Sequence, residues 1–371
     1  MGFCKHACTC VGVSVVALAV FIGFLTSEYS TPFFQYLDQY AGGRGKRLMG
    51  IVPAVHRGIP WRFTHDDMAA IDLTGQTILV TGANVGLGYW TAHSLAVHTN
   101  AKVVMACRSE SKCNAARDLI MEDKPEARVE TITVDLGSFA SIRSCAQEFL
   151  RRYEQANSLI LNAGIMMPPF QKTVDGIESQ MGVNHFGHFL LTRLLMPAVL
   201  RAAAGDGVAT IVAVSSSAHY NSHPEGIMSS LEEMNKESRY DRRNSYGQSK
   251  LANVLFAQEL AERYKDQNVL VNSIHPGAVK TELGRHILDF KNPLLKSMVE
   301  SLKTTSQIVW DPRDAALTQL YAAVSPDIIR KRVTGKYFHP IAREAVTDPH
   351  AWNMTLQKQL WALSEDAIAK L

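Results

Sequence analysis

From about Gln76 onward, the apolar residues of the chain fall into short runs that alternate with longer stretches of helical spacing. The run TILVTG precedes a predicted helix from about Leu87 to Val97, and VETITVDL precedes one from Ser141 to Tyr153. Later runs, such as VATIVAVSSS and VLVNSIHPG, are rich in β-branched residues and lack the polar alternation of a half-exposed strand. Parallel strands covered by helices on both faces have this pattern. The sequence therefore predicts an α/β fold, a Rossmann-type doubly wound parallel sheet flanked by helices.

The first thirty residues contain one long uncharged segment, from Ala7 to Thr26. A helix of this length, rising about 1.5 Å per residue, covers the roughly 30 Å hydrocarbon core of a bilayer. A cleaved signal peptide and a buried core helix are the alternatives, but no small-x-small cleavage site follows the run. Residues 1–30 are predicted to be a membrane anchor, and the denser positive charge after the segment places the rest of the chain in the cytosol. The endoplasmic reticulum is the expected membrane, with lipid droplet, mitochondrial and plastid membranes as alternatives.

The rest of the chain divides at about residue 74. Residues 31–73 are rich in Gly and Pro and are predicted to form a connector laid against the folded domain, which spans residues 74–371. With 46% hydrophobic residues, 20% charged residues and a net charge of +3, the composition is that of a globular protein. The basic residues are scattered and form no dense stripe, so small metabolites are better candidate partners than nucleic acid.

The six cysteines fall into two groups. Three crowd the first ten residues, where the membrane edge makes them candidates for lipidation. Cys107, Cys113 and Cys145 lie in one half of the predicted domain, without the histidine partners and spacing of a metal site. The domain is therefore predicted to be reduced and to bind no metal.

A glycine-rich loop, TGANVGLG from Thr81 to Gly88, follows the first predicted strand. Its glycines stand where a dinucleotide fold needs a tight turn, close approach to the pyrophosphate and close helix packing. The N-terminus of the next helix can then hold the phosphates. The residues expected to contact a cofactor here are Gly82, Asn84, Gly86, Leu87 and Gly88.

The ends of the second and third strands refine the choice of cofactor. A Rossmann unit that prefers NAD usually has an acidic residue near the end of the second strand, but this chain has Arg108, whose planar cation suits a 2′-phosphate. NADP(H) is therefore predicted, with a solvated surface arginine as the alternative reading. Asp135 and Leu136 after the third strand could bracket the adenine, although a helix N-cap is the plain alternative for Asp135.

Tyr246 and Lys250 lie four residues apart in YGQSK at the start of an apolar helix, and therefore on one face of it. A free tyrosine titrates near pH 10, but a neighbouring ammonium and a positive nicotinamide ring favour the phenolate, so that its pKa approaches the working range. An aromatic side chain packing beside a surface lysine is the alternative reading. Ser216, in the SSS run that ends a strand, could donate to a carbonyl oxygen as charge develops on it. The serines on either side of it could be ordinary strand-end hydroxyls.

The segment NHFGHF begins at Asn184 and is predicted to lie on a helix with apolar neighbours. A buried amide needs hydrogen-bond partners, and a water that links Asn184 to Lys250 would provide them. His185 and His188 are expected to pack or to form structural hydrogen bonds. Asn184 therefore joins the predicted catalytic set.

Together these motifs closely resemble the short-chain dehydrogenase/reductase superfamily of the classical type, and within it the retinol dehydrogenase-like group, over about residues 74–365. NAG after the fourth strand and PGAVKT after the sixth also match the family pattern, whereas Leu161 stands where the family often has asparagine. Besides Tyr246 and Lys250, the resemblance implies further cofactor contacts from Asn162, Ala163, Gly164, Pro276, Gly277, Val279 and Thr281.

The resemblance implies hydride transfer between NADP(H) and a carbonyl or alcohol. Tyr246 would give its proton to the substrate oxygen, Ser216 would hold that oxygen, and Lys250 would lower the tyrosine pKa and bind the nicotinamide ribose. Residues 282–303 would form a substrate lid whose apolar residues suggest a lipophilic, retinal-like substrate. The family often pairs through helices flanking the sheet, which makes a homodimer an expectation to test. A light-dependent protochlorophyllide reductase and a non-catalytic NADP(H)-sensing membrane scaffold are the alternative functions.

Overall fold

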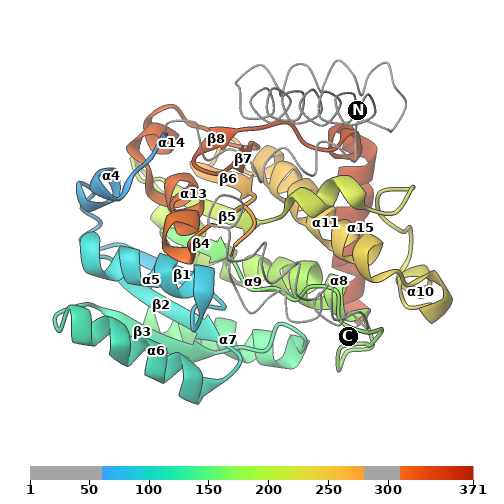
Figure 1. The fold of residues 1–371 in the computed structure, drawn as a ribbon, viewed down its shortest axis with the longest axis horizontal. Coiled ribbons are helices and arrows are strands. Elements are labelled where there is room, and N and C mark those ends of the chain that lie inside the picture. Colours follow the sequence, from blue (N-terminus) through green and yellow to red (C-terminus); the bar gives the residue numbers. More distant parts are fainter. Residues whose placement is uncertain (1–60, 280–309, 371) are drawn as a thin grey trace, which may run out of the picture.

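The computed structural model describes residues 61–279 and 310–370. Within them, eight strands form one sheet in the order β3-β2-β1-β4-β5-β6-β7-β8 (Figure 1). Neighbouring strands are parallel except for β7 and β8, which pair antiparallel. The strands are β1 (Thr77–Thr81), β2 (Lys102–Cys107), β3 (Val129–Thr133), β4 (Ser158–Leu161), β5 (Ala209–Val214), β6 (Val269–Ile274), β7 (Tyr337–His339) and β8 (Arg343–Glu344). The order reverses between β1 and β4, and open α/β sheets bind ligands at the carboxyl ends of strands beside such a switch point.

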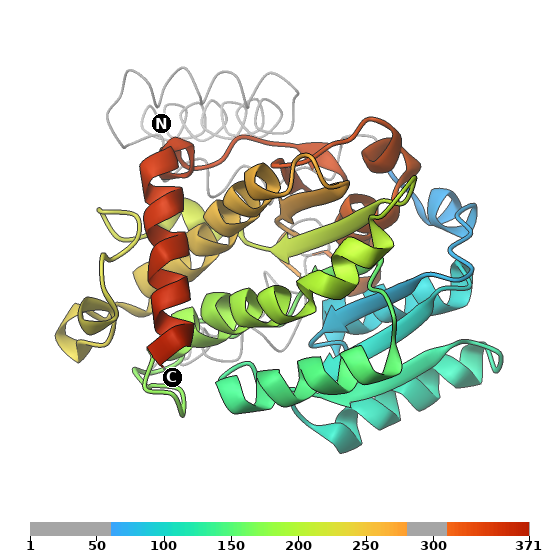
Figure 2. The same cartoon turned by 180° about the vertical axis from the view of Figure 1, so that it is seen from behind.

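Helices cover both faces of the sheet, which Figures 1 and 2 show from opposite sides. The helices on one face are α4 (His65–Ala69), α5 (Gly86–His98), α6 (Glu110–Asp123), α13 (Pro312–Val324) and α14 (Pro326–Arg330). Those on the other face are α7 (Phe139–Arg152), α9 (Gly187–Ala202), α11 (Arg242–Arg263) and α15 (Met354–Lys370), of which α15 packs against α11. The predicted Rossmann-type α/β fold is confirmed.

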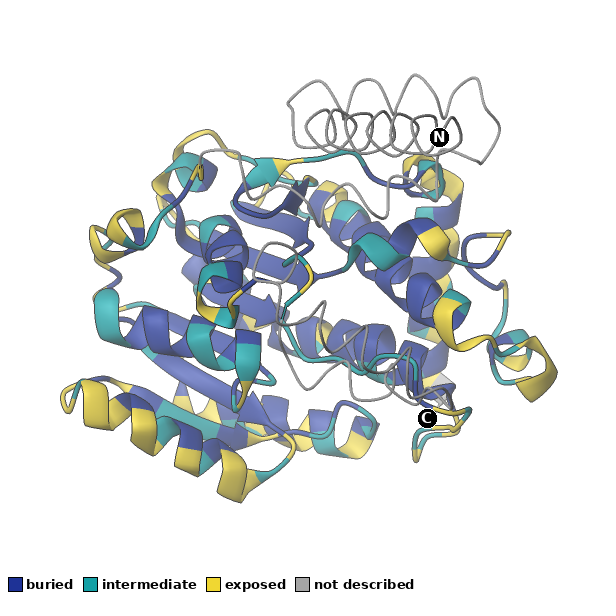
Figure 3. Cartoon of the chain, viewed as in Figure 1, coloured by how far each residue is buried: buried dark blue, intermediate teal, exposed yellow. Residues whose placement is uncertain are grey.

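The strands are buried because consecutive side chains enter two different cores. In β1, Ile78 and Val80 pack with α5 and α13, whereas Leu79 packs with α7 and α9 on the opposite face. Figure 3 shows that the centre of the sheet is buried throughout, while the outer side of α6 is exposed. This burial on both faces explains why the central strands are mostly apolar, whereas the edge strand β3 is only partly buried and contains polar residues.

Short helical segments connect the main elements: α8 (Ser179–Met181), the π-helix η3 (Gly182–Phe186), the 3-10 helix η4 (Ser217–Asn221), α10 (Leu231–Met234), and the 3-10 helices η5 (Glu237–Arg239) and η7 (Pro349–Trp352). Upstream of β1, Phe63, Met68 and Leu73 are buried in the same core as α5 and α13. Residues 61–73 therefore fold together with the body of the domain.

Cys107 and Cys113 form a disulfide, so the prediction of a reduced domain is wrong at this pair. Cys107 ends β2 and Cys113 lies near the start of α6, which brings their Cα atoms to 5.9 Å, a separation that a disulfide can bridge. The sequence spacing did not reveal this contact, because it depends on how the chain turns from strand to helix. Cys145 is free and buried in α7, where burial raises the pKa of its thiol to about 12.

The predicted anchor over residues 1–30, Thr281 and the predicted lid over residues 282–303 lie outside the described residues. Within residues 61–279 and 310–370, no helix combines the length and hydrophobicity that crossing a bilayer requires. The same part of the chain contains no group of three or more His, Cys, Asp or Glu side chains that could hold a metal ion.

Candidate functional site

The loop between β1 and α5 packs so closely that a side chain cannot fit at its tightest position. Gly82 and Gly86 have positive φ values of 64° and 57°, which glycine adopts at no steric cost. A Cβ on Gly88 would lie 2.3 Å from the main-chain oxygen of Gly82. The loop is therefore a tight turn that runs directly into the N-terminus of α5, where main-chain N–H groups favour an anion. Asn84 is half-buried in this turn, and Leu87 is buried behind it.

The end of β4 is joined to this loop by hydrogen bonds. The side-chain amide of Asn162 donates to the main-chain oxygens of Thr81 at 2.9 Å and Gly82 at 3.4 Å. The Ala163 nitrogen donates to the Thr81 hydroxyl at 3.0 Å. The Thr81 hydroxyl in turn lies 2.9 Å from Nε2 of His188. These contacts fix the two strand ends on either side of the switch point.

Arg108 follows β2 directly, and its side chain is exposed. Asp135 follows β3, and its carboxylate accepts a hydrogen bond from the Gly137 nitrogen at 2.8 Å. The N-cap of α7 is Ser138, whose hydroxyl accepts from the Ser141 nitrogen, so the alternative reading of Asp135 as an N-cap is wrong. Leu136 is buried in the core with α7 and α9.

Asn184 lies in the π-helix η3, a distortion often found at functional sites. Its side chain accepts from the Ile165 nitrogen at 2.8 Å and donates to the Ile165 oxygen and the Ser249 hydroxyl, each at 2.9 Å. A Cβ on Gly164 would lie 3.1 Å from the Asn184 side-chain oxygen and 3.5 Å from the Lys250 ammonium. Asn184 and Lys250 therefore converge on Gly164.

Tyr246 and Lys250 are both buried in α11, at 4% and 3% exposure. The Lys250 ammonium lies 5.7 Å from the centre of the Tyr246 ring and donates to the main-chain oxygen of Val214 at 3.0 Å. Burial lowers the pKa of Lys250 to about 8. Burial also raises the pKa of Tyr246 to about 12, and a hydrogen bond with Ser216 acts in the opposite direction. The sequence predicted a lowered pKa for Tyr246. In the protein alone the pKa is raised instead, because the effect of burial is larger than that of the hydrogen bond with Ser216.

The structure distinguishes the three adjacent serines by their partners. The Ser215 hydroxyl is buried and donates to the main-chain oxygen of Lys250 at 2.7 Å. The Ser216 hydroxyl accepts from the Ala218 nitrogen at 3.1 Å, at the start of η4, and hydrogen-bonds with Tyr246. Ser217 begins η4 and is half-buried. Ser216 is therefore the serine that the fold brings to Tyr246.

The segment after β6 turns sharply at Gly277, which has a φ of 92°. A Cβ there would lie 2.4 Å from the Trp310 ring, and Trp310 also forms a bridge with Val279. Pro276 and Gly277 are half-buried at this turn. Trp310 was missed by sequence reasoning, because nothing in its local sequence indicates a contact with residues more than thirty positions away.

The two histidines near Asn184 are structural, as expected. His185 lies with Nε2 2.8 Å from the Ser364 hydroxyl of α15, and Nδ1 of His188 lies 3.0 Å from the main-chain oxygen of Asn184. Burial lowers the pKa of His185 to about 3 and that of His188 to about 4. Both rings are therefore neutral at physiological pH.

The chain is similar in sequence to known short-chain dehydrogenases. The model of the family described as short chain dehydrogenase matches residues 76–292. Short-chain dehydrogenase TIC 32 A, chloroplastic, of Brassica napus is 38% identical over 81% of this chain and 91% of its own length. Retinol dehydrogenase 14 of Homo sapiens is 38% identical over 80% of this chain and 87% of its own.

Solved structures share the same architecture. An uncharacterized protein from Mycobacterium Paratuberculosis superposes with a TM-score of 0.61 at 31% identity, over 81% of this chain and 97% of that one. The Pseudomonas aeruginosa RhlG/NADP complex superposes with a TM-score of 0.56 at 23% identity, over 73% of this chain and 97% of that one. At 23% identity, the similarity to the second structure shows a shared fold and nothing further.

Proposed function

Because this chain belongs to the short-chain dehydrogenase family, in its retinol dehydrogenase-like group, and is an oxidoreductase acting on CH-OH groups, we propose that it interconverts a lipophilic carbonyl compound and its alcohol with NADP(H). The observation that carries this proposal is the convergence of a phenol, an ammonium, a hydroxyl and an amide near the glycine loop. Tyr246 and Ser216 hydrogen-bond, and Asn184 and Lys250 meet at Gly164.

The residues at the sheet edge fit a dinucleotide. At Gly82 and Gly88 the absence of a Cβ lets the loop pack against Ala163 and Asn162. At Gly164 it lets the chain pass close to Asn184 and Lys250. The proposed cofactor contacts are Gly82, Asn84, Gly86, Leu87, Gly88, Arg108, Asp135, Leu136, Asn162, Ala163, Gly164, Tyr246, Lys250, Pro276, Gly277, Val279 and Thr281. When bound, the nicotinamide supplies or accepts the hydride.

Arg108 supports NADP(H) over NAD(H), because an exposed guanidinium directly after β2 can pair with a 2′-phosphate. Arg108→Ala should weaken NADPH binding by about 10- to 100-fold and leave NADH binding within about twofold, since a charge-assisted contact contributes roughly 1.5–3 kcal/mol. Fluorescence titration with both nucleotides measures this. Equal losses of affinity for NADPH and NADH would contradict the proposed contact between Arg108 and the 2′-phosphate.

The side chains have separate roles in the proposed reaction. In the direction of reduction, Tyr246 gives its phenol proton to the carbonyl oxygen while the Ser216 hydroxyl donates a hydrogen bond to the same oxygen. The Lys250 ammonium favours the phenolate that remains and binds the nicotinamide ribose. Asn184 retains a water that returns a proton from solvent through Lys250, and its two bonds to Ile165 hold the loop after β4 in place.

The proposed substrate class rests on the apolar character of the loop after β4. Ile165, Met166 and Met167 are half-buried directly beside Gly164, and relatives of this chain are retinol dehydrogenases by name. A lipophilic aldehyde or ketone fits such a wall, since burying its apolar surface contributes about 25 cal/mol per Å².

The test is an activity panel on the full chain in detergent. NADPH and NADH are each combined with retinal, long-chain aldehydes, short polar aldehydes and protochlorophyllide, in light and in darkness. We expect NADPH oxidation with the lipophilic carbonyls, unchanged in darkness. Turnover of protochlorophyllide in light alone would support the light-dependent reductase instead, and cofactor binding without turnover of any substrate would support the NADP(H)-sensing scaffold.

We further propose that residues 1–30 anchor the protein in the endoplasmic reticulum membrane with the catalytic domain in the cytosol. The chloroplastic relative in Brassica napus favours a plastid membrane as the alternative location. Carbonate extraction, protease protection and fractionation of cells test these proposals. Release of the protein by carbonate would contradict the anchor.

A further inference from the structure

His219 lies in η4 and joins Ser216 to a distant part of the chain. Its buried ring has Nδ1 2.7 Å from the main-chain oxygen of Ser216 and Nε2 3.0 Å from the main-chain nitrogen of Asp348. The Asp348 N–H can only donate, so Nε2 must accept, and the ring proton is then on Nδ1, which donates to Ser216. A single neutral tautomer satisfies both contacts.

The ring of His219 is also held by aromatic neighbours. The ring centres of Tyr220 and Tyr337 lie 4.0 Å and 4.8 Å from that of His219. Burial lowers the pKa of His219 to about 4, which agrees with the neutral tautomer. At physiological pH, His219 is therefore a fixed and uncharged link.

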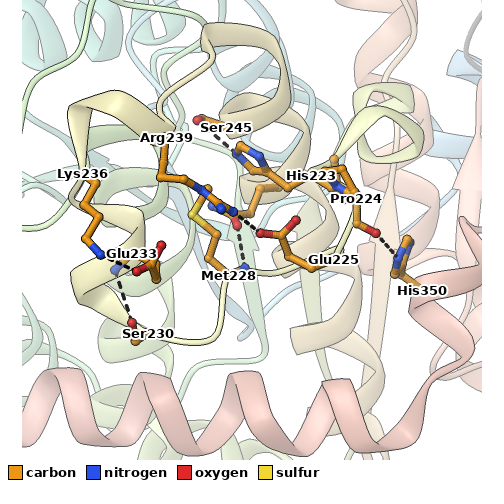
Figure 4. Close-up of polar contacts among 12 residues, drawn as sticks. His223, Pro224, Glu225, Met228, Ser230, Glu233, Lys236, Arg239, Ser245 and His350 are labelled. Atoms are coloured by element: carbon orange, nitrogen blue, oxygen red, sulfur yellow. Dashed lines mark hydrogen bonds and ion pairs between the residues drawn. The ribbon is translucent and has the colours of Figure 1, made fainter.

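The C-terminal segment Val346–His350 has further contacts with the chain that follows Ser216. The Tyr220 hydroxyl donates to the main-chain oxygen of Val346. Nε2 of His350 lies 3.2 Å from the main-chain oxygen of Pro224 (Figure 4). A Cβ on Gly226 would lie 2.7 Å from the His350 ring. The two segments therefore pack as one unit, although more than 120 residues separate them.

The same unit packs directly against the helix that carries Tyr246. A Cβ on Gly247 would lie 2.2 Å from the main-chain oxygen of Asn221 and 2.7 Å from that of Ala218. A shift of η4 would therefore change the distance between Ser216 and Tyr246. Whatever fixes η4 also fixes the geometry of the proposed catalytic pair.

We propose that His219 is a positioning residue, which holds the Ser216 hydroxyl beside the Tyr246 phenol by linking the Ser216 main chain to the Val346–His350 segment. This inference rests on the proposed function of Ser216 and Tyr246. His219 acts through Ser216 and exchanges no proton with the substrate.

Substitutions at His219 test the link through kcat. His219→Phe keeps an aromatic ring without hydrogen bonds, and should lower kcat about tenfold to 100-fold while KM stays within about twofold, because a small misplacement of a reacting group costs this much. His219→Asn places an amide N–H near the position of Nδ1 and should recover most of the loss. His93→Phe is the matched control, since His93 is a buried histidine of α5 that contacts Asp123 instead; kcat should be unchanged.

A double variant separates positioning from a general loss of stability. If His219 acts through Ser216, the variant that combines His219→Phe with Ser216→Ala should have the kcat of Ser216→Ala alone. A double variant whose loss of kcat is the product of the two single losses would overturn the inference. A kcat for His219→Asn as low as that for His219→Phe would also overturn it.

Asp348 offers a second test if His219→Phe does not fold. The φ of Asp348 is −54°, which proline can adopt. Asp348→Pro and Asp348→Ala both remove the carboxylate. Only the proline removes the main-chain N–H that donates a hydrogen bond to His219. The proline variant should therefore have the lower kcat, and equal values would overturn the link.

The outcomes also separate this inference from the proposed function. Fully active Ser216→Ala, or wild-type protein without NADPH-dependent turnover, would reject the proposed function and the inference with it. Inactive Ser216→Ala beside fully active His219→Phe would reject the positioning role alone.

Discussion

The two halves of the sheet build their parts of the site in different ways. Around β1 and α5, the shape of the loop comes from residues close together in sequence. Gly82 and Gly86 have positive φ, and Gly88 lies against the oxygen of Gly82 only six residues earlier. Such a loop is recognisable as a motif because a few consecutive residues determine its backbone.

Around β5 and α11, the site depends on contacts between segments far apart in sequence. Lys250 is held by Val214, 36 residues away, and His219 by Asp348, 129 residues away. A sequence motif there identifies the reacting residue but does not indicate the contacts that position it. Substitutions in the first half should therefore affect cofactor binding, and substitutions in the second half should affect turnover.

The largest effect on cofactor binding is expected from Gly88→Ala. The added Cβ would lie 2.3 Å from a main-chain oxygen and 2.5 Å from the Asn162 amide. NADPH binding should weaken at least about 100-fold, because the loop must open where the phosphates would bind. Gly205→Ala is the control for an added methyl group, since no atom lies within 4 Å of the Gly205 Cβ position and the variant adds only the strain of a positive φ. Fluorescence titration with NADPH measures both, and wild-type affinity in Gly88→Ala would contradict cofactor binding at this loop.

Gly247→Ala should have the converse effect in the other half. The Cβ would push α11 away from η4, because it would lie 2.2 Å from the Asn221 oxygen. We expect kcat to fall about 30-fold, and the Kd for NADPH to change less than about threefold, since the displacement separates the reacting groups and leaves the glycine loop intact. Steady-state kinetics and titration on the same sample show whether turnover and binding separate. A loss of NADPH affinity as large as the loss of kcat would contradict the division.

The smallest effect is on stability, in Lys250→Met. Burial lowers the pKa of Lys250 from 10.5 to about 8 in the folded protein. Below pH 8 the lysine is charged in both states, and the cost of burying that charge is fully present. Between pH 8 and 10.5 the unfolded chain binds more protons than the folded one, so the wild type gains stability as pH rises. At pH 7 the variant should be more stable by about 1–2 kcal/mol, and the difference should narrow towards pH 10.

Urea denaturation of both proteins at pH 7 and pH 9.5 measures this difference. The Val214 oxygen keeps a hydrogen bond in the variant, because the Asn253 amide donates to it at 3.0 Å. A Lys250→Met protein that is less stable than the wild type at pH 7 would contradict an unfavourable burial of this charge.

The sequence predicted the features that depend on local pattern. The central strands appear as mostly apolar runs because both of their faces are buried, and the helix predicted from Leu87 to Val97 is α5 (Gly86–His98). The glycine loop and the four-residue spacing of Tyr246 and Lys250 could likewise be recognised, since each depends on one turn of backbone.

Features that depend on the folded chain could not be predicted. The Cys107–Cys113 disulfide, the contact between Gly277 and Trp310 and the link from His219 to Asp348 have no periodicity or motif in the sequence. The raised pKa of Tyr246 belongs here as well. The sequence indicated the neighbouring ammonium, but the degree of burial that raises this pKa depends on the packing of α11.

Tyr246→Phe is the sharpest test of the proposed roles, in which Tyr246 transfers the proton and the glycine loop binds the cofactor. The variant keeps the buried ring and removes the phenol hydroxyl, and NADPH-dependent turnover and NADPH affinity are measured on the same protein. We expect a kcat lower by about 10²–10⁴-fold with a Kd for NADPH within about threefold of the wild type, as for loss of a general acid. Wild-type turnover in Tyr246→Phe would contradict it.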